Sequence, residues 1–425
     1  MISDRLAQRL ETELGADAIT TDPRILKSHE VDGKRGRIFC APGTTEGVIA
    51  ALRICAETRA AVTPWGGGTA MSIGNPPEKA EVVLSLDRLN RVIEHDSANL
   101  TVTVEAGATI NGLNRCVNRE RQFLAIEPPR PAVATIGGTI AANLNGPRRS
   151  AYGTVRDLVI GIKAALVTGE HVKAGGKVVK NVAGYDMCKL FVGSLGTLGV
   201  ITEATLRVSP IPESAATKTA TGPLPDLLQA ADAVVQSQLS PTSIFLVGKR
   251  ETGNTPELQW ELAVASEGFD GTVARHLRDF QSFAESDRLQ IGTLRESDHD
   301  LYWEQVREFP LKPGASVYRI VVPRAGIGRI ANLCEPRANE ILVDALSGVL
   351  WIRELEAPQQ RGFSELGELA RDHKGHAMLF TAPAECKGGL DVWGPAPESL
   401  FLMRRIKRQF DPYELLNPGR FAGGL

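Results

Sequence analysis

The chain has 425 residues, of which 43% are hydrophobic and 23% are charged, and its formal net charge is −2. This length exceeds what one compact core usually holds, so the composition predicts a globular protein of two or three domains. The balanced charge gives no sign of a nucleic-acid partner, because such partners favour a marked excess of positive charge.

The cysteines are scattered, and no two of them have C-x-x-C spacing. We therefore expect reduced, mostly buried thiols in a cytoplasmic protein, and no metal or iron–sulfur site. The amino-terminal stretch is charged and amphipathic, without the apolar segment of a signal peptide. No apolar run is long enough to span a bilayer. The expected location is the cytoplasm, with peripheral attachment to the inner membrane through partners as the alternative.

The first part of the chain predicts helices and strands in close alternation. Residues 2–15 have the apolar spacing of a helix. A second helix follows Thr44 or Thr45 as its N-cap, and its expected buried stripe contains four residues, Val48, Ile49, Leu52 and Cys55. A strand then leads into three consecutive glycines.

Strand patterns continue up to residue 210. Residues 81–86 read as a strand, and residues 100–105 alternate apolar and polar side chains like a half-buried strand. A hairpin is expected at Thr168-Gly169, and a further strand ends at Pro210. The residues up to 210 therefore predict a mixed α+β domain.

The composition changes after residue 210. The stretch PIPESAATKTATGPLPD reads as a linker, because it is rich in proline, serine, threonine and alanine. Alternating strand and helix patterns follow and favour an α+β, ferredoxin-like second domain. We therefore expect a first domain over residues 1–210, a second, cap or substrate domain over 211–400, and a carboxy-terminal segment over 401–425 that returns toward the first domain.

Four glycine-bearing stretches are the strongest functional signal. The first, VTPWGGGTAMSIGN, contains Gly66 to Gly68. Its glycines bring bare N–H groups close to a phosphate, or they form an ordinary surface turn. If they bind a phosphate, Gly67→Val is expected to displace it and leave the fold intact.

The other three stretches are ATIGGTIAANLNG, GGKVVKNVAGYD and GSLGTLGVITEA. Four such stretches beside strands suggest one long ligand across several strand ends, and a dinucleotide has that shape. The spacing differs from the Rossmann fingerprint G-x-G-x-x-G, because the run is G-G-G-T and a strand follows it.

These motifs resemble the flavin-binding domain of the vanillyl-alcohol oxidase and p-cresol methylhydroxylase (PCMH) superfamily. The run from IEPPRPAVATIGGTIAANLNG to GSLGTLGVITEATLRV is similar to the FAD-binding E subunits of bacterial glycolate oxidases, and the closing FDPYELLNPGRF resembles their last segment. The resemblance covers roughly residues 40–210 and the last 25 residues.

The resemblance implies a PCMH-type FAD-binding domain with an α+β cap. It implies that FAD contacts fourteen residues: Pro64, Trp65, Gly66, Gly67, Gly68, Thr69, Thr135, Gly137, Gly138, Asn143, Gly196, Thr197, Gly199 and Ile201. Some members carry a histidine at the position of Thr69 and bond it to the flavin, so FAD is expected to be noncovalent here. Trp65 is a candidate for cofactor contact or for the domain core.

The resemblance also implies an FAD-dependent oxidoreductase that oxidises glycolate to glyoxylate. Such complexes contain a related FAD-binding D-type subunit and an iron–sulfur subunit, to which this chain would relay electrons. Two alternatives remain: a stand-alone FAD-dependent dehydrogenase of another small 2-hydroxy acid, and a non-catalytic assembly subunit.

Other polar residues have weaker claims. His373 and His376 invite a metal interpretation, but a strand beginning near Gly375 would separate them, so no metal site is expected. Arg148 and Arg149 are candidates for a substrate carboxylate, a partner subunit or a structural carboxylate. Three further residues, Lys180, Tyr185 and Asp186, lie in a closely matching stretch, and none of these is identified as catalytic.

Overall fold

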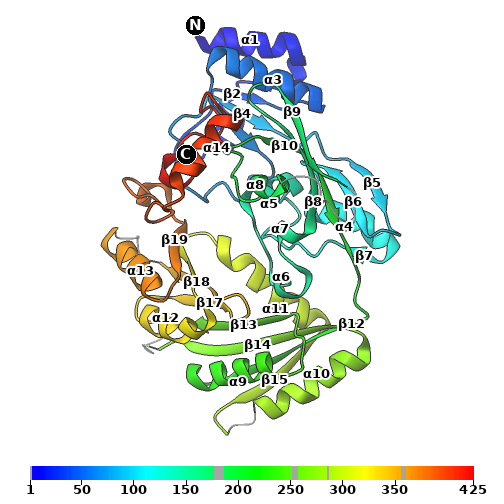
Figure 1. Cartoon of the computed structure of the whole chain (residues 1–425), viewed down its shortest axis with the longest axis vertical. Helices are drawn as coiled ribbons and strands as arrows, with labels where there is room; N and C mark the ends of the chain where they lie inside the picture. Colours follow the sequence, from blue (N-terminus) through cyan, green and yellow to red (C-terminus); the bar gives the residue numbers. More distant parts are fainter. Residues whose placement is uncertain (1, 177–185, 251–256, 285–286, 356–359) are drawn as a thin grey trace. The chain divides into compact units, whose positions relative to one another are not determined.

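The computed structural model describes residues 2–176, 186–250, 257–284, 287–355 and 360–425 (Figure 1). The chain divides into two compact units. Unit 1 contains residues 1–145, 154–210 and 387–425, and unit 2 contains residues 146–153 and 211–386. This division differs from the expected domains at residues 146–153, which join unit 2, and at residues 387–400, which join unit 1.

Unit 1 begins with a four-stranded sheet in the order β1-β2-β4-β3. Its strands are β1 (Ile19–Thr20), β2 (Ile38–Cys40), β3 (Val62–Trp65) and β4 (Val82–Ser85). β4 lies between β2 and β3 and runs parallel to both. The helices α1 (Ile2–Leu14) and α3 (Thr45–Thr58) pack together beside it (Figure 1). Thr44 caps α3 as predicted, since its hydroxyl accepts a hydrogen bond from the Gly47 N–H at 3.1 Å.

A second, antiparallel sheet of unit 1 has the order β5-β6-β10-β8-β9. It contains β5 (Val92–Asp96), β6 (Thr101–Glu105), β8 (Val159–Ala165), β9 (His171–Gly175) and β10 (Val200–Arg207). β8 and β9 form the predicted hairpin, with Gly169 at φ 86°. The predicted half-buried alternation of β6 is wrong, because Thr103 and Glu105 are buried as well as the valines. Thr103 pairs with Thr205, and Glu105 pairs with Arg91.

The other elements of unit 1 are short. The helices are α2 (Pro23–Ser28), α4 (Ile110–Val117), α5 (Ile136–Ala142), α7 (Val155–Leu158), α8 (Cys188–Phe191) and α14 (Leu400–Phe410). β7 (Gln122–Phe123) pairs with β11 (Ser209–Pro210). Short 3-10 turns η1 (Ala16–Ala18), η2 (Asn118–Glu120) and η6 (Ala422–Gly424) complete this part of the described chain.

Unit 2 is built on an eight-stranded antiparallel sheet in the order β15-β12-β14-β13-β17-β18-β16-β19 (Figure 1). Its first half contains β12 (Ser214–Thr221), α9 (Leu224–Gln236), β13 (Ser243–Lys249), β14 (Gln259–Gly268), α10 (Asp270–Phe283) and β15 (Gln290–Arg295). Its second half contains β16 (Ser316–Val321), α12 (Ile327–Cys334), β17 (Glu340–Asp344), β18 (Val349–Glu354), α13 (Gln360–Asp372) and β19 (His376–Thr381). Each half has the ferredoxin-like order β-α-β-β-α-β, so the predicted α+β cap is confirmed and is duplicated.

The predicted linker is wrong. Residues Ser214–Thr221 form β12, which hydrogen-bonds to both β14 and β15 inside the sheet. Small and β-hydroxylated side chains suit this strand because Ala216 and Thr217 are both buried, on opposite faces. The composition of this stretch therefore reflects a tightly packed strand.

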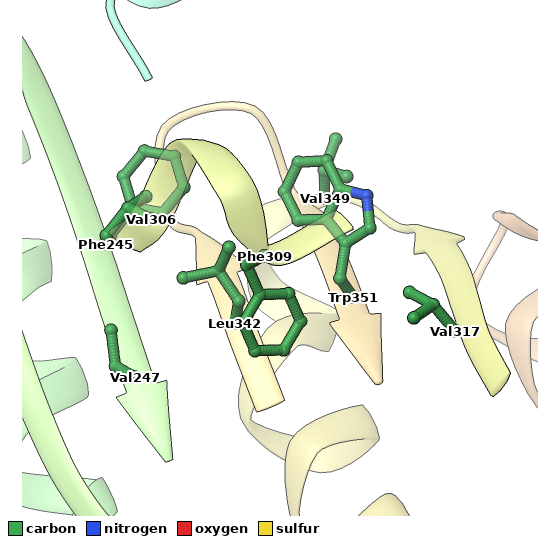
Figure 2. Close-up of a cluster of buried hydrophobic side chains, with 8 residues drawn as sticks. All are labelled: Phe245, Val247, Val306, Phe309, Val317, Leu342, Val349 and Trp351. Carbon is green, nitrogen blue, oxygen red and sulfur yellow. The ribbon is translucent and has the colours of Figure 1, made fainter. Parts of the chain in front are cut away.

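The two faces of the sheet in unit 2 carry different helices. Ala216 packs against Val273 and Leu277 of α10. On the opposite face, α11 (Glu296–Glu308) and the turn η3 (Phe309–Leu311) cover an apolar cluster of Phe245, Val247, Val306, Phe309, Val317, Leu342, Val349 and Trp351 (Figure 2). Opposed residues in an antiparallel pair share a face, so Arg319, opposite Trp351, lies on the α11 face. α6 (Arg149–Tyr152) and the turns η4 (Arg324–Gly326) and η5 (Ala384–Cys386) complete the described elements.

Candidate cofactor site

The triple-glycine loop follows β3 directly and packs against residues 133–135. A Cβ on Gly67 would lie 1.9 Å from the Val133 carbonyl oxygen, and one on Gly66 would lie 2.2 Å from Thr135 Oγ1. Gly68 has φ 67°, in the left-handed region that favours glycine. The loop therefore needs glycine for its own packing, and the expectation that Gly67→Val would leave the fold intact is wrong.

Trp65, at the end of β3, packs in a hydrophobic cluster and also borders a pocket beside the glycine loop. It packs with Val31 and Val83 and is 8% exposed. Its ring lies 4.7 Å from that of His29. Trp65 therefore packs in the core of unit 1 and also lines the pocket.

The second stretch begins α5, which Thr135 caps through its hydroxyl and the Gly138 N–H at 3.3 Å. Gly137 packs on Ala106, where a Cβ would approach to 2.7 Å. Asn143 ends the helix with φ 50°, and its side-chain oxygen accepts a hydrogen bond from Asn145. Asn143 therefore has a local role at the helix end.

The third described stretch runs from Leu195 to Ile201 and enters β10. Leu195 and Gly196 both have positive φ, at 51° and 70°. Thr197 is buried, and its hydroxyl donates to the Ser194 carbonyl at 2.8 Å. This stretch turns the chain sharply beside β3, because the Cβ position of Gly196 lies 3.3 Å from Pro64.

A fourth segment, close to the carboxy terminus, joins these three. The Val62 N–H donates to the Leu415 carbonyl at 2.7 Å, and the Asn417 N–H donates back to the Val62 carbonyl at 2.9 Å. Asn417 Nδ2 also donates to the Leu195 carbonyl at 2.7 Å. The chain end thus lies along the edge strand β3 and brings Asn417 and Arg420 to the glycine loops.

These segments line a pocket that is partly open to solvent. Twelve of the fourteen predicted residues line it, and Asn143 and Thr197 do not. The other lining residues are Ala70, Met71, Leu86, Ala141, Ala142, Leu195, Val200, Asn417 and Arg420. Sequence reasoning missed Asn417 and Arg420, although the segment FDPYELLNPGRF had been singled out.

Arg420 is the charged side chain among the described residues of this pocket wall. It is 2% exposed, and Nη2 donates to the carbonyls of Met71, at 2.9 Å, and Ile73. Nε, Nη1 and the side-chain oxygen of Asn417 have no hydrogen-bond partner among the described residues. Burial lowers the pKa of Arg420 to about 10, while Asp32 acts in the opposite direction, so the guanidinium stays charged at neutral pH.

The two candidate arginines of the sequence, Arg148 and Arg149, both lie in unit 2 but differ in their contacts. Arg148 Nε donates to Glu267 at 2.7 Å, and Tyr152 donates to the same carboxylate at 3.0 Å. Within the described residues, the side chains of Arg149 and Arg319 have no hydrogen bond or salt bridge. Burial, and then the charge of nearby Arg149, lower the pKa of Arg319 to about 10.

His376 lies on the same sheet face as Arg319. It opens β19 opposite Val321, and burial followed by the charge of Arg319 lowers its pKa. The buried carboxylate of Asp344 lies near Arg149, but it already accepts hydrogen bonds from Ser347 and two backbone N–H groups. A half-buried pair of arginines beside a histidine is an arrangement that attracts an anion.

The remaining candidates have structural contacts or lie outside the description. His373 Nδ1 lies 3.0 Å from the Leu369 carbonyl oxygen at the end of α13. Asp186 pairs with Lys189 at 3.2 Å. Lys180 and Tyr185 lie outside the described residues. No group of three or more potential metal ligands occurs in the described part of the chain.

Two further properties bear on the predicted environment. None of the helices in the described ranges is long and apolar enough to cross a bilayer. All six cysteines are free thiols. Burial raises the pKa of Cys40, Cys55 and Cys334 to about 12, which keeps these thiols protonated and unreactive.

The sequence is similar to known FAD-binding proteins. A family model described as "FAD binding domain" matches residues 37–175. The D-2-hydroxyglutarate dehydrogenase of Xanthomonas citri pv. viticola is 34% identical, over 97% of this chain and 95% of that protein. Glycolate oxidase subunit GlcE of Escherichia coli (strain K12) is 31% identical, over 79% of this chain and 85% of that protein.

Two further comparisons extend this result. Glycolate oxidase subunit GlcD of Bacillus subtilis (strain 168) is 28% identical, over 89% of this chain and 87% of that protein. The crystal structure of p-cresol methylhydroxylase with substrate bound has a TM-score of 0.79 and 16% identity, covering 99% of this chain and 96% of that one. The structural similarity shows a shared fold over both units.

Proposed function

Because the chain belongs to the PCMH-type superfamily of FAD-dependent oxidoreductases, we propose that it oxidises a small 2-hydroxy acid such as glycolate. FAD is its cofactor. We propose unit 1 as the FAD-binding domain and unit 2 as the substrate domain. The observation that carries the proposal is a glycine-lined pocket in unit 1, together with two arginines in unit 2 whose side chains have no partner among the described residues.

The pocket in unit 1 fits FAD in its chemistry. Its wall is mostly glycine, alanine and apolar side chains, so backbone N–H groups can approach a long ligand closely. Two nitrogens of the buried Arg420 and the side-chain oxygen of Asn417 have no hydrogen-bond partner among the described residues. The fourteen residues named from the sequence remain our proposed contacts, although Asn143 and Thr197 would have to act from outside the pocket wall.

Bound FAD would supply the acceptor for the two electrons that leave the hydroxyl-bearing carbon of the substrate. The chain supplies buried residues to the pocket wall, since Trp65, Thr69 and Leu195 are each less than 10% exposed. Thr69 has no nucleophilic ring nitrogen with which to bond the flavin. We therefore propose that FAD is held noncovalently.

The arginine pair in unit 2 supports an anionic substrate. A 2-hydroxy acid is a carboxylate at neutral pH, and guanidinium groups bind carboxylates through two parallel hydrogen bonds. Arg148 is neutralised by Glu267, whereas Arg149 and Arg319 keep their donors for a ligand. We assign the carboxylate contact to Arg149 and Arg319, with His376 on the same face of the sheet.

The chain is further proposed to work as the E-type subunit of a glycolate oxidase complex. The similarity to subunit GlcE supports a role as this subunit. We propose that the chain there relays electrons from a D-type flavin subunit to an iron–sulfur subunit. The free thiols of this chain support a cytoplasmic location, and attachment to the inner membrane would then depend on the partner subunits.

A second candidate is a stand-alone dehydrogenase of another 2-hydroxy acid. It is favoured by the D-2-hydroxyglutarate dehydrogenase relative, which is similar over nearly the whole chain. The candidates differ in one measurable respect: the stand-alone enzyme reduces its own flavin with substrate when no other subunit is present. A non-catalytic assembly subunit would not do so in either condition.

The test uses the purified chain under anaerobic conditions. We expect a yellow protein that releases its flavin into the supernatant on acid precipitation. Glycolate, D-lactate and D-2-hydroxyglutarate are then added separately, and bleaching of the flavin absorbance is followed with and without the partner subunits. Bleaching by glycolate only in the complex supports the E-type role. Bleaching of the isolated chain by another acid supports the second candidate, and a colourless chain that cannot take up FAD contradicts both.

A further inference from the structure

Arg420 is a buried cation whose hydrogen bonding is incomplete. Its side chain is among the largest fully buried ones in the described part of the chain. Within the described ranges, only Nη2 has acceptors, the carbonyls of Met71 and Ile73. Nε and Nη1 have none, and leaving charged donors unpaired in a protein interior is costly. A residue with this cost at a pocket wall indicates a ligand that completes the bonding.

The carboxylate of Asp32 does not complete this bonding. Asp32 influences the pKa of Arg420, but its Oδ2 is held by Lys387 Nζ at 2.8 Å. Lys387 is itself fully buried and also donates to the carbonyls of Ser72 and Gly74. Asp32 therefore pairs with Lys387, and no carboxylate among the described residues is hydrogen-bonded to Arg420.

The described part of the pocket wall supplies no other charged side chain. Apart from Arg420, its lining residues are glycine, alanine, proline, threonine, asparagine, tryptophan, methionine and aliphatic side chains. FAD carries two negative charges, both on its pyrophosphate. A neutral glycine-lined pocket would have to hold these charges with backbone dipoles alone, unless the one cation in the wall contacts them.

We propose that Arg420 binds the pyrophosphate of FAD through Nε and Nη1, the two nitrogens that have no partner among the described residues. This proposal rests on the proposed function, because it assumes that FAD occupies the pocket. It adds a contact that comes from the last residues of the chain and not from a glycine loop. Arg420 is thus a cofactor-binding residue.

The backbone around Arg420 is built to fix its position. The Arg420 carbonyl accepts hydrogen bonds from the Asn75 N–H and from Trp393 Nε1, each at 3.0 Å. Asn417 and Gly419 have φ of 44° and 86°, so the chain turns tightly just before the arginine. A Cβ on Gly74 would lie 2.7 Å from the Arg420 carbonyl oxygen, which shows how closely the two segments pack. Binding therefore meets a preorganised guanidinium.

The experiment measures FAD binding by the apoprotein, with flavin fluorescence as the readout. The variants are Arg420→Gln, Arg420→Lys and, as the matched control, Arg408→Gln, which removes an exposed arginine of α14. We expect Arg420→Gln to weaken FAD binding by about 10- to 100-fold, Arg420→Lys to weaken it less, and Arg408→Gln to leave it unchanged. ADP, which has the pyrophosphate but no flavin, is measured by competition. Its affinity for Arg420→Gln should fall by the same factor as that of FAD, whereas the affinity for riboflavin should not change.

Each outcome decides the proposal. Equal FAD affinity of Arg420→Gln and the unchanged protein overturns it and leaves the proposed function standing. Loss of FAD affinity with unchanged ADP affinity overturns it too, since the arginine would then contact the flavin end. An unchanged protein that binds no FAD overturns both proposals. If Arg420→Gln does not fold, the unchanged protein decides, because equal affinities for ADP and adenosine would exclude a pyrophosphate contact.

Discussion

Gly67 illustrates how a residue chosen for one reason can be required for another. The sequence suggested a phosphate behind the glycines, and the structure puts the Val133 carbonyl oxygen where a side chain would begin. Both interpretations demand glycine, so the motif alone could not separate them. The apoprotein can distinguish the two interpretations, because without FAD only the packing against Val133 still requires glycine at position 67.

We expect Gly67→Ala to lower the free energy of unfolding of the apoprotein by about 1–3 kcal/mol, the usual effect of forcing an extra carbon into a packed site. Denaturant unfolding measures this change. The matched control is Gly43→Ala, since a Cβ there meets nothing within 4 Å and φ is not in the left-handed region. An apoprotein of unchanged stability that has lost FAD binding would support the phosphate interpretation instead.

His299 is a second residue with a measurable consequence. Trp303 Nε1 donates to Thr217 Oγ1 at 2.8 Å, and this hydroxyl lies 2.9 Å from His299 Nδ1. The hydroxyl can donate to Nδ1 only when this nitrogen is unprotonated. Burial lowers the pKa of His299 below its ordinary value of 6.5, and the charge of Glu267 opposes this effect. His299 is therefore neutral in the folded protein at pH 7.

The sign of the pH dependence follows from this lowered pKa. Between the folded pKa and 6.5 the unfolded chain binds more protons, so stability falls as the pH falls through this window. One such proton contributes a slope of at most about 1.4 kcal/mol per pH unit. We expect His299→Gln to reduce the slope of unfolding free energy between pH 7 and 5.5, with His276 supplying part of what remains, since burial lowers the pKa of His276 too. An identical slope in the variant would show that His299 does not titrate on unfolding.

At the scale of elements, local signals predicted regular structure well and failed where tertiary packing overrides composition. The cap of α3 could be predicted, because Thr44 and the apolar spacing after it act within one turn. β12 was missed, because its alanines and threonines look like a linker until strands on both sides bury them. β6 was given one exposed face, because its polar residues find buried partners outside the strand: Thr103 pairs with the distant Thr205, and Glu105 pairs with Arg91, just before β5.

The carboxy-terminal segment depends on a buried ion pair at the end of α14. Lys407 Nζ lies 2.7 Å from Asp411 Oδ2 and also donates to the carbonyls of Thr197 and Leu416. Asp411 accepts the N–H groups of Leu415 and Leu416 as well. Burial lowers the pKa of Lys407, and Asp411 opposes this effect. The pair thus holds the start of the segment that reaches the pocket.

We expect Asp411→Ala to lower the free energy of unfolding by about 3–5 kcal/mol, because it leaves the Lys407 charge buried and unpaired. Asp279→Ala is the matched control: it removes the exposed i,i+4 partner of Arg275 and should cost less than about 0.5 kcal/mol. Chemical denaturation measures both. A cost for Asp411→Ala as small as that of the control would show that the segment is not held by this pair.

At the scale of the whole molecule, the pocket is assembled from segments more than 300 residues apart in the chain. The glycine loops could be found in the sequence because glycine clusters are rare and their spacing is recognisable. Asn417 and Arg420 could not be assigned a role, because neither residue type nor spacing shows that the chain end pairs with Val62. The duplicated sheet of unit 2 was likewise visible only as alternating strands and helices, since pairing order is not encoded locally.

This assembly predicts that cofactor binding and the chain end are coupled. FAD at 100 times its dissociation constant should stabilise the intact chain by about 2.7 kcal/mol, seen as a concentration-dependent rise in the melting temperature. A chain that ends at Phe410 lacks Asn417 and Arg420 and also frees the edge of β3, so its melting temperature should be lower and should not respond to FAD. A chain that ends at Ala422 keeps both pocket residues and should respond like the intact protein. If the chain ending at Phe410 folds and still shows the full FAD response, the carboxy-terminal segment is not part of the cofactor site, and the glycine loops alone must hold the dinucleotide.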